Sequence, residues 1–170
     1  GWYLRQDIIW HKPNPMPESV TDRCTKAHEY IFLLTKNQKY HYDNEAIKED
    51  ALYAGVPRGG STNRYEQNNF GGDNKQYDTK NKRSVWSVPV KPYKIAHFAT
   101  YPEDLIEPCV LAGCRQGGTI LDPFAGAGTT GLVAKKNGCN FIGIELNPDY
   151  AEIARKRIES EQRGLFYEAT

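Results

Sequence analysis

The fold of this chain is decided by one stretch, Leu121-Asp122-Pro123-Phe124-Ala125-Gly126-Ala127-Gly128-Thr129-Thr130-Gly131. Its glycines have Gly-x-Gly-x-x-Gly spacing, after a predicted strand at 119–122 and before a predicted helix at 129–137. Glycines at such a turn let the backbone approach a ligand closely, and the helix N-terminus presents free N–H groups and a partial positive charge. An acid, Glu145, follows 19 residues beyond Gly126 at the end of the next predicted strand, where it can accept both hydroxyls of a ribose. The stretch therefore predicts a site for an adenosine-bearing cofactor.

The residues just before the glycines narrow the choice of cofactor. Asp122 and Phe124 stand at the mouth of the loop, where an acid would repel the pyrophosphate of a dinucleotide such as NAD. The same acid suits the ammonium and sulfonium groups of S-adenosylmethionine, whose carboxylate can still meet the loop N–H groups. We therefore favour S-adenosylmethionine, with a dinucleotide or a ligand-free structural loop as the alternatives.

Strands and helices alternate around this loop. A strand is predicted at 140–146, followed by a helix that starts at Asn147-Pro148 and runs to about residue 164. The order strand, helix, strand, helix is typical of a right-handed βαβ unit with a parallel sheet, and hence of an α/β fold. Upstream, Thr100 and Glu103 have the spacing of a capping box for a helix that ends at Gly113.

The N-terminal part reads as strand, loop and strand. An apolar run at 7–10 ends at a segment with prolines at 13, 15 and 17, which favours an extended loop. The segment 29–35 is rich in β-formers and reads as a buried strand.

Composition excludes several classes of protein. The chain has 170 residues, a formal net charge of +1 and 39% hydrophobic residues, which argues against a strongly basic nucleic-acid coat and against a disordered chain. No apolar run approaches the length of a membrane span, and no signal segment opens the sequence. We therefore expect a cytoplasmic protein without a membrane partner.

No metal site is expected. The four cysteines form no Cys-x-x-Cys pair and read as reduced thiols. His28-Glu29 begins a zinc-protease pattern, but Phe32 stands where the second histidine belongs, and His11 and His41 have no partners at ligand spacing.

The segment 55–83 differs from the rest of the chain. It has five glycines, five asparagines and six basic residues against three acids, an excess of +3, and it cannot form a core of its own. It is either a solvated insertion or a loop that contacts nucleic acid with cations interleaved among aromatics. The candidate DNA-binding residues are Arg58, Arg64, Lys80, Lys82 and Arg83.

The stretch 121–130 resembles the first motif of DNA amino-methyltransferases, which methylate N6 of adenine or N4 of cytosine. The segment 141–146 with Tyr150 resembles their second motif, and 97–102 followed by Leu105-Ile106 resembles the motif that precedes the first one in the β class of these enzymes. Upstream, 8–19 and 25–32 resemble later motifs of the catalytic half. Cys24 stands between Arg23 and Thr25, where the family tends to have proline. The resemblance covers nearly the whole chain.

The resemblance implies a partial Rossmann-like methyltransferase sheet that binds S-adenosylmethionine and double-stranded DNA. It divides the chain into part of the catalytic half at 1–50, a target-recognition insertion at 51–85 and the cofactor-binding half at 86–170. The implied cofactor-binding residues are His97, Phe98, Ala99, Thr100, Asp122, Pro123, Phe124, Gly126, Gly128, Thr129, Thr130, Glu145 and Leu146.

One motif of the family is missing. Its enzymes stack a flipped base on the aromatic residue of an Asp/Asn/Ser-Pro-Pro-aromatic tetrapeptide and hold the base by its amino group. The sequence contains no Pro-Pro dipeptide, and the near-matches at 91–93 and 147–150 lack the required residues. In the β arrangement the tetrapeptide precedes this sequence, so we expect no catalytic residue here, a missing upstream half, and no methyl transfer by this chain alone.

Three functions stay open at this point. The chain is the C-terminal portion of a bacterial or phage-encoded restriction-modification methyltransferase, or an inactive methyltransferase-like module that binds nucleic acid. The third is a methyltransferase for RNA, protein or a small molecule. A homodimer is also compatible with the sequence, and the choice between adenine and cytosine depends on the missing tetrapeptide.

Overall fold

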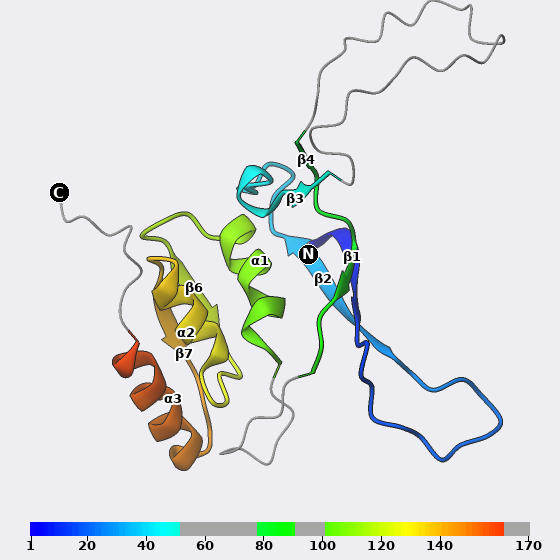
Figure 1. Cartoon of the computed structure of the whole chain (residues 1–170). Coiled ribbons are helices and arrows are strands. Elements are labelled where there is room, and N and C mark those ends of the chain that lie inside the picture. The colour runs from blue at the N-terminus through cyan, green and yellow to red at the C-terminus, as the bar shows by residue number, and fades with distance from the viewer. Residues whose placement is uncertain (52–77, 91–100, 162–170) are drawn as a thin grey trace, which may run out of the picture.

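The computed structural model describes residues 1–51, 78–90 and 101–161 (Figure 1). The predicted site residues Arg58 and Arg64 and the segment 97–100 lie outside these ranges. The described residues form two principal sheets with helices between and beside them, and a short third sheet.

The first sheet contains three strands in the order β2-β1-β5. Strand β1 (Tyr3–His11) pairs antiparallel with β2 (His28–Thr35), and parallel with β5 (Val85–Ser87). The proline-containing loop between β1 and β2 projects away from the sheet (Figure 1), as the prolines predict. On one face of this sheet, Ile8, Trp10 and Trp86 join Leu105 in a buried hydrophobic cluster.

Helix α1 (Glu103–Gly113) covers that face with Leu105 and lies between the two principal sheets (Figure 1). The predicted capping box is wrong, because Pro102 is the N-cap residue and Glu103 therefore occupies the first helical position instead of the third. The Glu103 carboxylate instead pairs with Lys136 at 2.7 Å, which ties α1 to the end of α2.

The second principal sheet is the predicted βαβ unit. Strands β6 (Thr119–Asp122) and β7 (Asn140–Gly143) are parallel, and α2 (Thr129–Lys136) connects them. Helix α3 (Pro148–Ser160) follows, and the side chain of Asn147 caps it by accepting a hydrogen bond from the Asp149 N–H at 2.9 Å, which confirms the predicted helix start. Strand β7 is shorter than predicted because the chain turns at Glu145, whose carboxylate accepts the Asn147 N–H at 2.8 Å.

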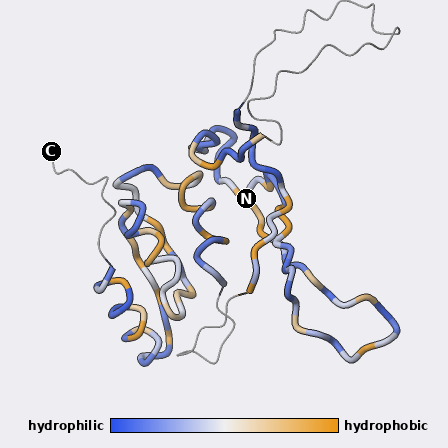
Figure 2. Tube along the Cα trace, in the orientation of Figure 1, coloured by the Kyte–Doolittle hydropathy of each residue, from blue (hydrophilic) through white to orange (hydrophobic). Residues whose placement is uncertain are grey.

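A smaller two-stranded ribbon lies on either side of the segment 52–77 in sequence. It consists of a single 3-10 turn (Glu45–Ile47) and the paired strands β3 (Glu49–Asp50) and β4 (Thr79–Lys80). Both principal sheets carry hydrophobic stretches, whereas this region is mostly hydrophilic (Figure 2). Within the described ranges, no helix combines the length and apolar character needed to cross a membrane.

Candidate cofactor site and its relatives

Asp122 ends β6 and organises the turn that follows. One carboxylate oxygen accepts the backbone N–H of Phe124 at 3.0 Å, and the other accepts the Thr130 hydroxyl at 2.6 Å. The Tyr101 hydroxyl approaches the second oxygen at 3.3 Å and also bonds the Thr130 hydroxyl. Burial, together with the charge of Asp122, raises the pKa of Tyr101, so this phenol stays protonated at neutral pH. The loop is therefore held by a half-buried network around one carboxylate.

Glu145 joins the end of β7 to the same loop. Its Oε2 atom accepts the Gly126 N–H at 2.8 Å, and its Oε1 atom accepts the Asn147 N–H. A carboxylate offers about four acceptor positions, so two remain for the hydroxyls of a ribose. The sequence spacing predicted an acid beside the glycine loop, and the structure places it there.

The glycines of the loop serve different purposes. Gly126 has a φ of +51°, and a Cβ built on it would have no neighbour closer than 4.0 Å, so the loop is open at this position. Gly128 has a φ of +78°, but a Cβ there would lie 2.8 Å from the Cβ of Ala154 in α3. A Cβ on Gly131 would collide with Ile158 and Phe141. The positive φ therefore accounts for Gly126, which leaves open space beside it, whereas Gly128 and Gly131 are required by packing against α3 and Phe141.

The remaining predicted cofactor residues fall into two groups. Phe124 and Leu146 are 87% and 98% exposed, and they follow the loop acid Asp122 and the strand-end acid Glu145 closely in sequence. Thr129 and Thr130 are buried, and the Thr130 hydroxyl is already used on Asp122. Pro123 is exposed.

These features fit an adenosine-bearing cofactor. The carboxylate of Glu145 has free acceptor positions, the backbone at Gly126 is open, and large apolar side chains at Phe124 and Leu146 are available to cover a purine. The α2 N-terminus adds a partial positive charge for a carboxylate. In the described part of the chain, no cluster of three His, Cys, Asp or Glu side chains could hold a metal ion.

The predicted DNA-binding cations are only partly described. Lys80 pairs with Glu49 in the β3–β4 register, and Glu49 also accepts a hydrogen bond from Arg83 at 3.2 Å. The Lys82 ammonium lies 3.7 Å from the other Glu49 oxygen and 5.2 Å from the centre of the Trp86 ring. Glu49 therefore holds Lys82 and Arg83 close together beside the paired strands β3 and β4, which we call the root of the insertion.

A family model described as DNA methylase matches residues 1–156. The chain belongs to this family. The match confirms the family that the motifs predict, and it includes the loop, Glu145 and both principal sheets.

Two bacterial relatives are similar to this chain over nearly its whole length. The type II methyltransferase M.Cfr9I of Citrobacter freundii is 45% identical over 165 residues, which are 97% of this chain and 47% of the relative. M.SmaI of Serratia marcescens is 48% identical over 158 residues, which are 93% of this chain and 47% of the relative. The chain thus spans about half the length of the relatives it matches.

Solved structures support the methyltransferase fold. M1.HpyAVI, crystallised as a complex with SAM, has a TM-score of 0.61 at 25% identity, with 93% of this chain and 63% of that chain covered. The cytosine-N4-specific PvuII DNA methyltransferase has a TM-score of 0.62 at 16% identity, and the match covers 97% of this chain and 61% of that chain. Because the identity is so low, this match shows the fold alone. The predicted α/β methyltransferase fold is confirmed.

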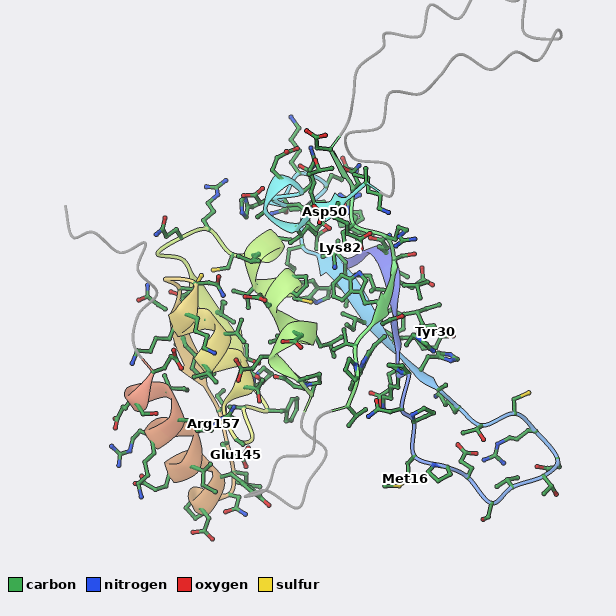
Figure 3. The ribbon with its side chains drawn as sticks, viewed as in Figure 1. Met16, Tyr30, Asp50, Lys82, Glu145 and Arg157 are labelled. Carbon is green, nitrogen blue, oxygen red and sulfur yellow. The ribbon has the colours of Figure 1, made fainter. Side chains whose placement is uncertain are left out.

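Sequence reasoning missed two residues that hold the glycine loop. Tyr101 bonds the Asp122–Thr130 pair, and Arg157 donates to the Ala127 carbonyl at 2.8 Å from α3. Figure 3 shows Arg157 and Glu145 near each other at the α3 side of the loop. The signal for Tyr101 was its place directly after the predicted 97–100 segment. No sequence signal pointed to Arg157, because its contact with Ala127 depends on how α3 packs.

Proposed function

We propose that this chain is the cofactor-binding and target-recognition portion of a site-specific DNA methyltransferase. The whole enzyme would transfer a methyl group from S-adenosylmethionine to N6 of adenine or N4 of cytosine in double-stranded DNA. Family membership and the type II methyltransferases among its relatives support this proposal. DNA as substrate and bacterial relatives favour a bacterial or phage-encoded protein that works in the cytoplasm.

The observation that carries the proposal is the contact between Glu145 and Gly126, which brings the acid at the end of β7 onto the open part of the glycine loop. Glu145 would accept the ribose hydroxyls, while Phe124 and Leu146 would cover the adenine. When bound, S-adenosylmethionine supplies an electrophilic methyl group on its sulfonium. Asp122, with three donors on its carboxylate in the structure, keeps one acceptor position for the ammonium of the ligand.

The attacking amino group must be positioned by residues that this sequence does not contain. With no Pro-Pro dipeptide in the 170 residues, the chain offers no aromatic platform of that type for a flipped base. We therefore place the catalytic tetrapeptide in the part of the methyltransferase that corresponds to the unmatched half of the relatives. The division into 1–50, 51–85 and 86–170 belongs to the same proposal.

DNA contact is assigned to the insertion and its root. Lys80, Lys82 and Arg83 lie at the root in the structure, and Arg58 and Arg64 belong to the same basic segment in sequence. Cations of this kind would meet phosphates, and the polar side chains between them would meet base edges.

Calorimetric titration with S-adenosylmethionine tests the cofactor site. Replacing Glu145 with Gln removes the charge and one acceptor oxygen, which is expected to weaken binding at least tenfold, since a hydrogen bond to a charged group contributes about 1.5–3 kcal/mol. The matched control is Glu152→Gln, an exposed acid on α3 that pairs with Arg155 and lies outside the proposed site. It should bind within about twofold of the wild type.

Circular dichroism of Glu145→Gln verifies that the loop variant stays folded. Unchanged affinity in a folded Glu145→Gln protein would refute the ribose assignment. Tighter binding of NAD than of S-adenosylmethionine would reassign the site to a dinucleotide.

A further inference from the structure

Two cysteines that are distant in sequence meet at the end of the β6–β7 sheet that lies away from the glycine loop (Figure 1). Cys114 directly follows α1, and Cys139 directly precedes β7. Both thiols donate to the same oxygen, the Arg115 carbonyl, at sulfur–oxygen distances of 3.4 Å and 3.7 Å. The two sulfur atoms therefore lie close together, although the sequence contains no Cys-x-x-Cys pair.

The small residue at the start of β6 makes this approach possible. A Cβ built on Gly118 would lie 2.8 Å from the Cys114 sulfur, so a larger residue would displace the thiol. The Gly118 carbonyl accepts the N–H of Asn140 at 2.7 Å, which places the preceding residue, Cys139, beside the same end of the strand. The backbone N–H of each cysteine also donates to a carbonyl of the preceding helix. The fold therefore holds both cysteines in place.

The two thiols affect each other's protons. Burial, followed by the hydrogen bond and the charge of Cys114, raises the pKa of Cys139 to about 11. Because the thiolate is the reactive form, Cys139 is poorly suited to attack first. The first attack on an oxidant therefore belongs to Cys114. Once Cys114 has reacted, its charge no longer opposes the ionisation of Cys139.

A cavity of about 340 Å³ gives access to the pair. Both cysteines line it, together with His41, Asp43 and Arg115. The Arg115 side chain donates from Nε to the His41 Nδ1 atom at 3.3 Å, so a guanidinium stands at the wall of the cavity. This cation suits the carboxylates of a small peptide disulfide such as oxidised glutathione.

We propose that Cys114 and Cys139 form a reversible disulfide in the folded chain, with oxidised glutathione or a similar small disulfide as the oxidant. The Cys114 thiolate attacks one glutathione sulfur, breaks the S–S bond and releases a glutathione thiolate, which takes up the proton lost from Cys114. The Cys139 sulfur then attacks the mixed disulfide and releases the second glutathione, which takes the Cys139 proton. Two protein thiols are oxidised, and one glutathione disulfide is reduced to two thiols.

The disulfide closes residues 114–139 into a covalent ring. This ring contains β6, the glycine loop and α2. A cross-link restricts the unfolded chain and so stabilises the fold, more strongly for a longer closed loop. Disulfides of cytosolic proteins are usually transient or redox-sensing, which agrees with a bond that forms only under oxidising conditions. The inference does not depend on the proposed methyl transfer.

The test incubates the reduced full chain with oxidised glutathione, blocks the remaining thiols with N-ethylmaleimide and analyses tryptic peptides by mass spectrometry without reduction. We expect a peptide pair linked through Cys114 and Cys139. Fragmentation spectra assign the bond, because Cys109 shares the tryptic peptide 95–115 with Cys114. The linked chain should melt about 5–10 °C above the reduced chain, and dithiothreitol should reverse this shift.

Serine variants separate the two steps. Cys139→Ser should stop at a mixed disulfide between glutathione and Cys114, and Cys114→Ser should give no link to Cys139. The matched control is Cys24→Ser, which removes an exposed thiol on the loop between β1 and β2 and should behave as the wild type.

Mapping of the wild-type chain decides the proposal even where a serine variant is unstable. Absence of the Cys114–Cys139 link, or a link that uses Cys24 or Cys109 instead, would overturn the proposal. A linked chain whose melting temperature does not rise would overturn the stabilising role of the ring.

Discussion

At the scale of single residues, Asp122 and Glu145 work in the same way. Each carboxylate is fixed by backbone N–H groups of the loop that it borders, and each keeps acceptor capacity for a ligand. Preorganised charged groups of this kind lose little freedom when the ligand arrives. The loop is thus shaped before the cofactor binds.

The Asp122 network predicts a larger loss of stability when the Thr130 hydroxyl is removed than when the Tyr101 hydroxyl is removed. Thr130→Val removes the buried donor at 2.6 Å and should lower the free energy of unfolding by about 1.5–3 kcal/mol, as expected for a hydrogen bond to a charged group. Tyr101→Phe removes the 3.3 Å bond to the carboxylate and the contact with the neutral Thr130 hydroxyl, and should cost only about 0.5–1.5 kcal/mol. Urea unfolding of both variants provides the comparison. A larger loss for Tyr101→Phe would show that the phenol holds the loop.

At the scale of elements, two glycines in the same loop should respond differently to alanine. Both have positive φ, which costs a non-glycine residue about 1–2 kcal/mol. Gly128→Ala adds a clash with Ala154, and overpacking of this kind costs about 1–3 kcal/mol more. Thermal unfolding should therefore rank Gly128→Ala as the less stable variant.

Titration with S-adenosylmethionine compares the same two alanine variants by their affinity for the cofactor. Gly126→Ala should weaken S-adenosylmethionine binding while staying well folded, because its Cβ would enter the open side of the loop. Equal stabilities of the two variants would contradict the packing role of Gly128.

In the β3–β4 ribbon, Glu49 pairs with two of the proposed DNA-binding cations, Lys82 and Arg83. Partial burial acts to raise the pKa of Glu49, but the hydrogen bond from Arg83 and the charges of Lys82 and Arg83 outweigh it, so the pKa is lowered from its usual value. A lowered pKa means that this pairing stabilises the fold above the unfolded value of about 4.3 and is lost as the pH falls through the folded value. At neutral pH the carboxylate is ionised, and in the proposed DNA-binding role it would compete with phosphate for Lys82 and Arg83.

Glu49→Gln should therefore release both cations at neutral pH. We expect tighter binding to a duplex oligonucleotide and a steeper salt dependence, by about 0.9 in log–log slope for each phosphate gained. Fluorescence anisotropy at several KCl concentrations measures both quantities. Glu45→Gln, which breaks the ion pair with Lys48, is the control and should change neither. An unchanged slope in Glu49→Gln would indicate that Lys82 and Arg83 do not contact phosphates.

Short sequence patterns predicted strands, helix starts and residue spacing, but they did not predict contacts between elements that pack together. The strand at 119–122, the helix start at Asn147 and the position of Glu145 follow from short patterns of turn, cap and spacing, and the structure has all three. The role of Gly128 depends on Ala154, which is 26 residues away, and the pairing of Arg83 depends on Glu49 across the insertion. Such contacts are set by how elements pack, and no local pattern encodes them.

At the scale of the whole molecule, the chain combines a well-organised cofactor loop with exposed apolar faces on both principal sheets. A self-sufficient α/β enzyme would cover such faces with helices. Together with the 47% share of its relatives, this arrangement supports the proposal that the chain is one part of a larger methyltransferase.

Transfer of a tritiated methyl group from S-adenosylmethionine to unmethylated duplex DNA of mixed sequence tests this division of labour. The assay compares the chain alone with the chain co-expressed with the part of M.Cfr9I outside the match. We predict no transfer above background by the chain alone, because it has no platform for the flipped base, and transfer when the other half is present. Acid hydrolysis of the product then identifies adenine or cytosine as the methylated base. Robust transfer by the chain alone would contradict the proposal, and the segment 147–150 would be the first place to seek the catalytic residues.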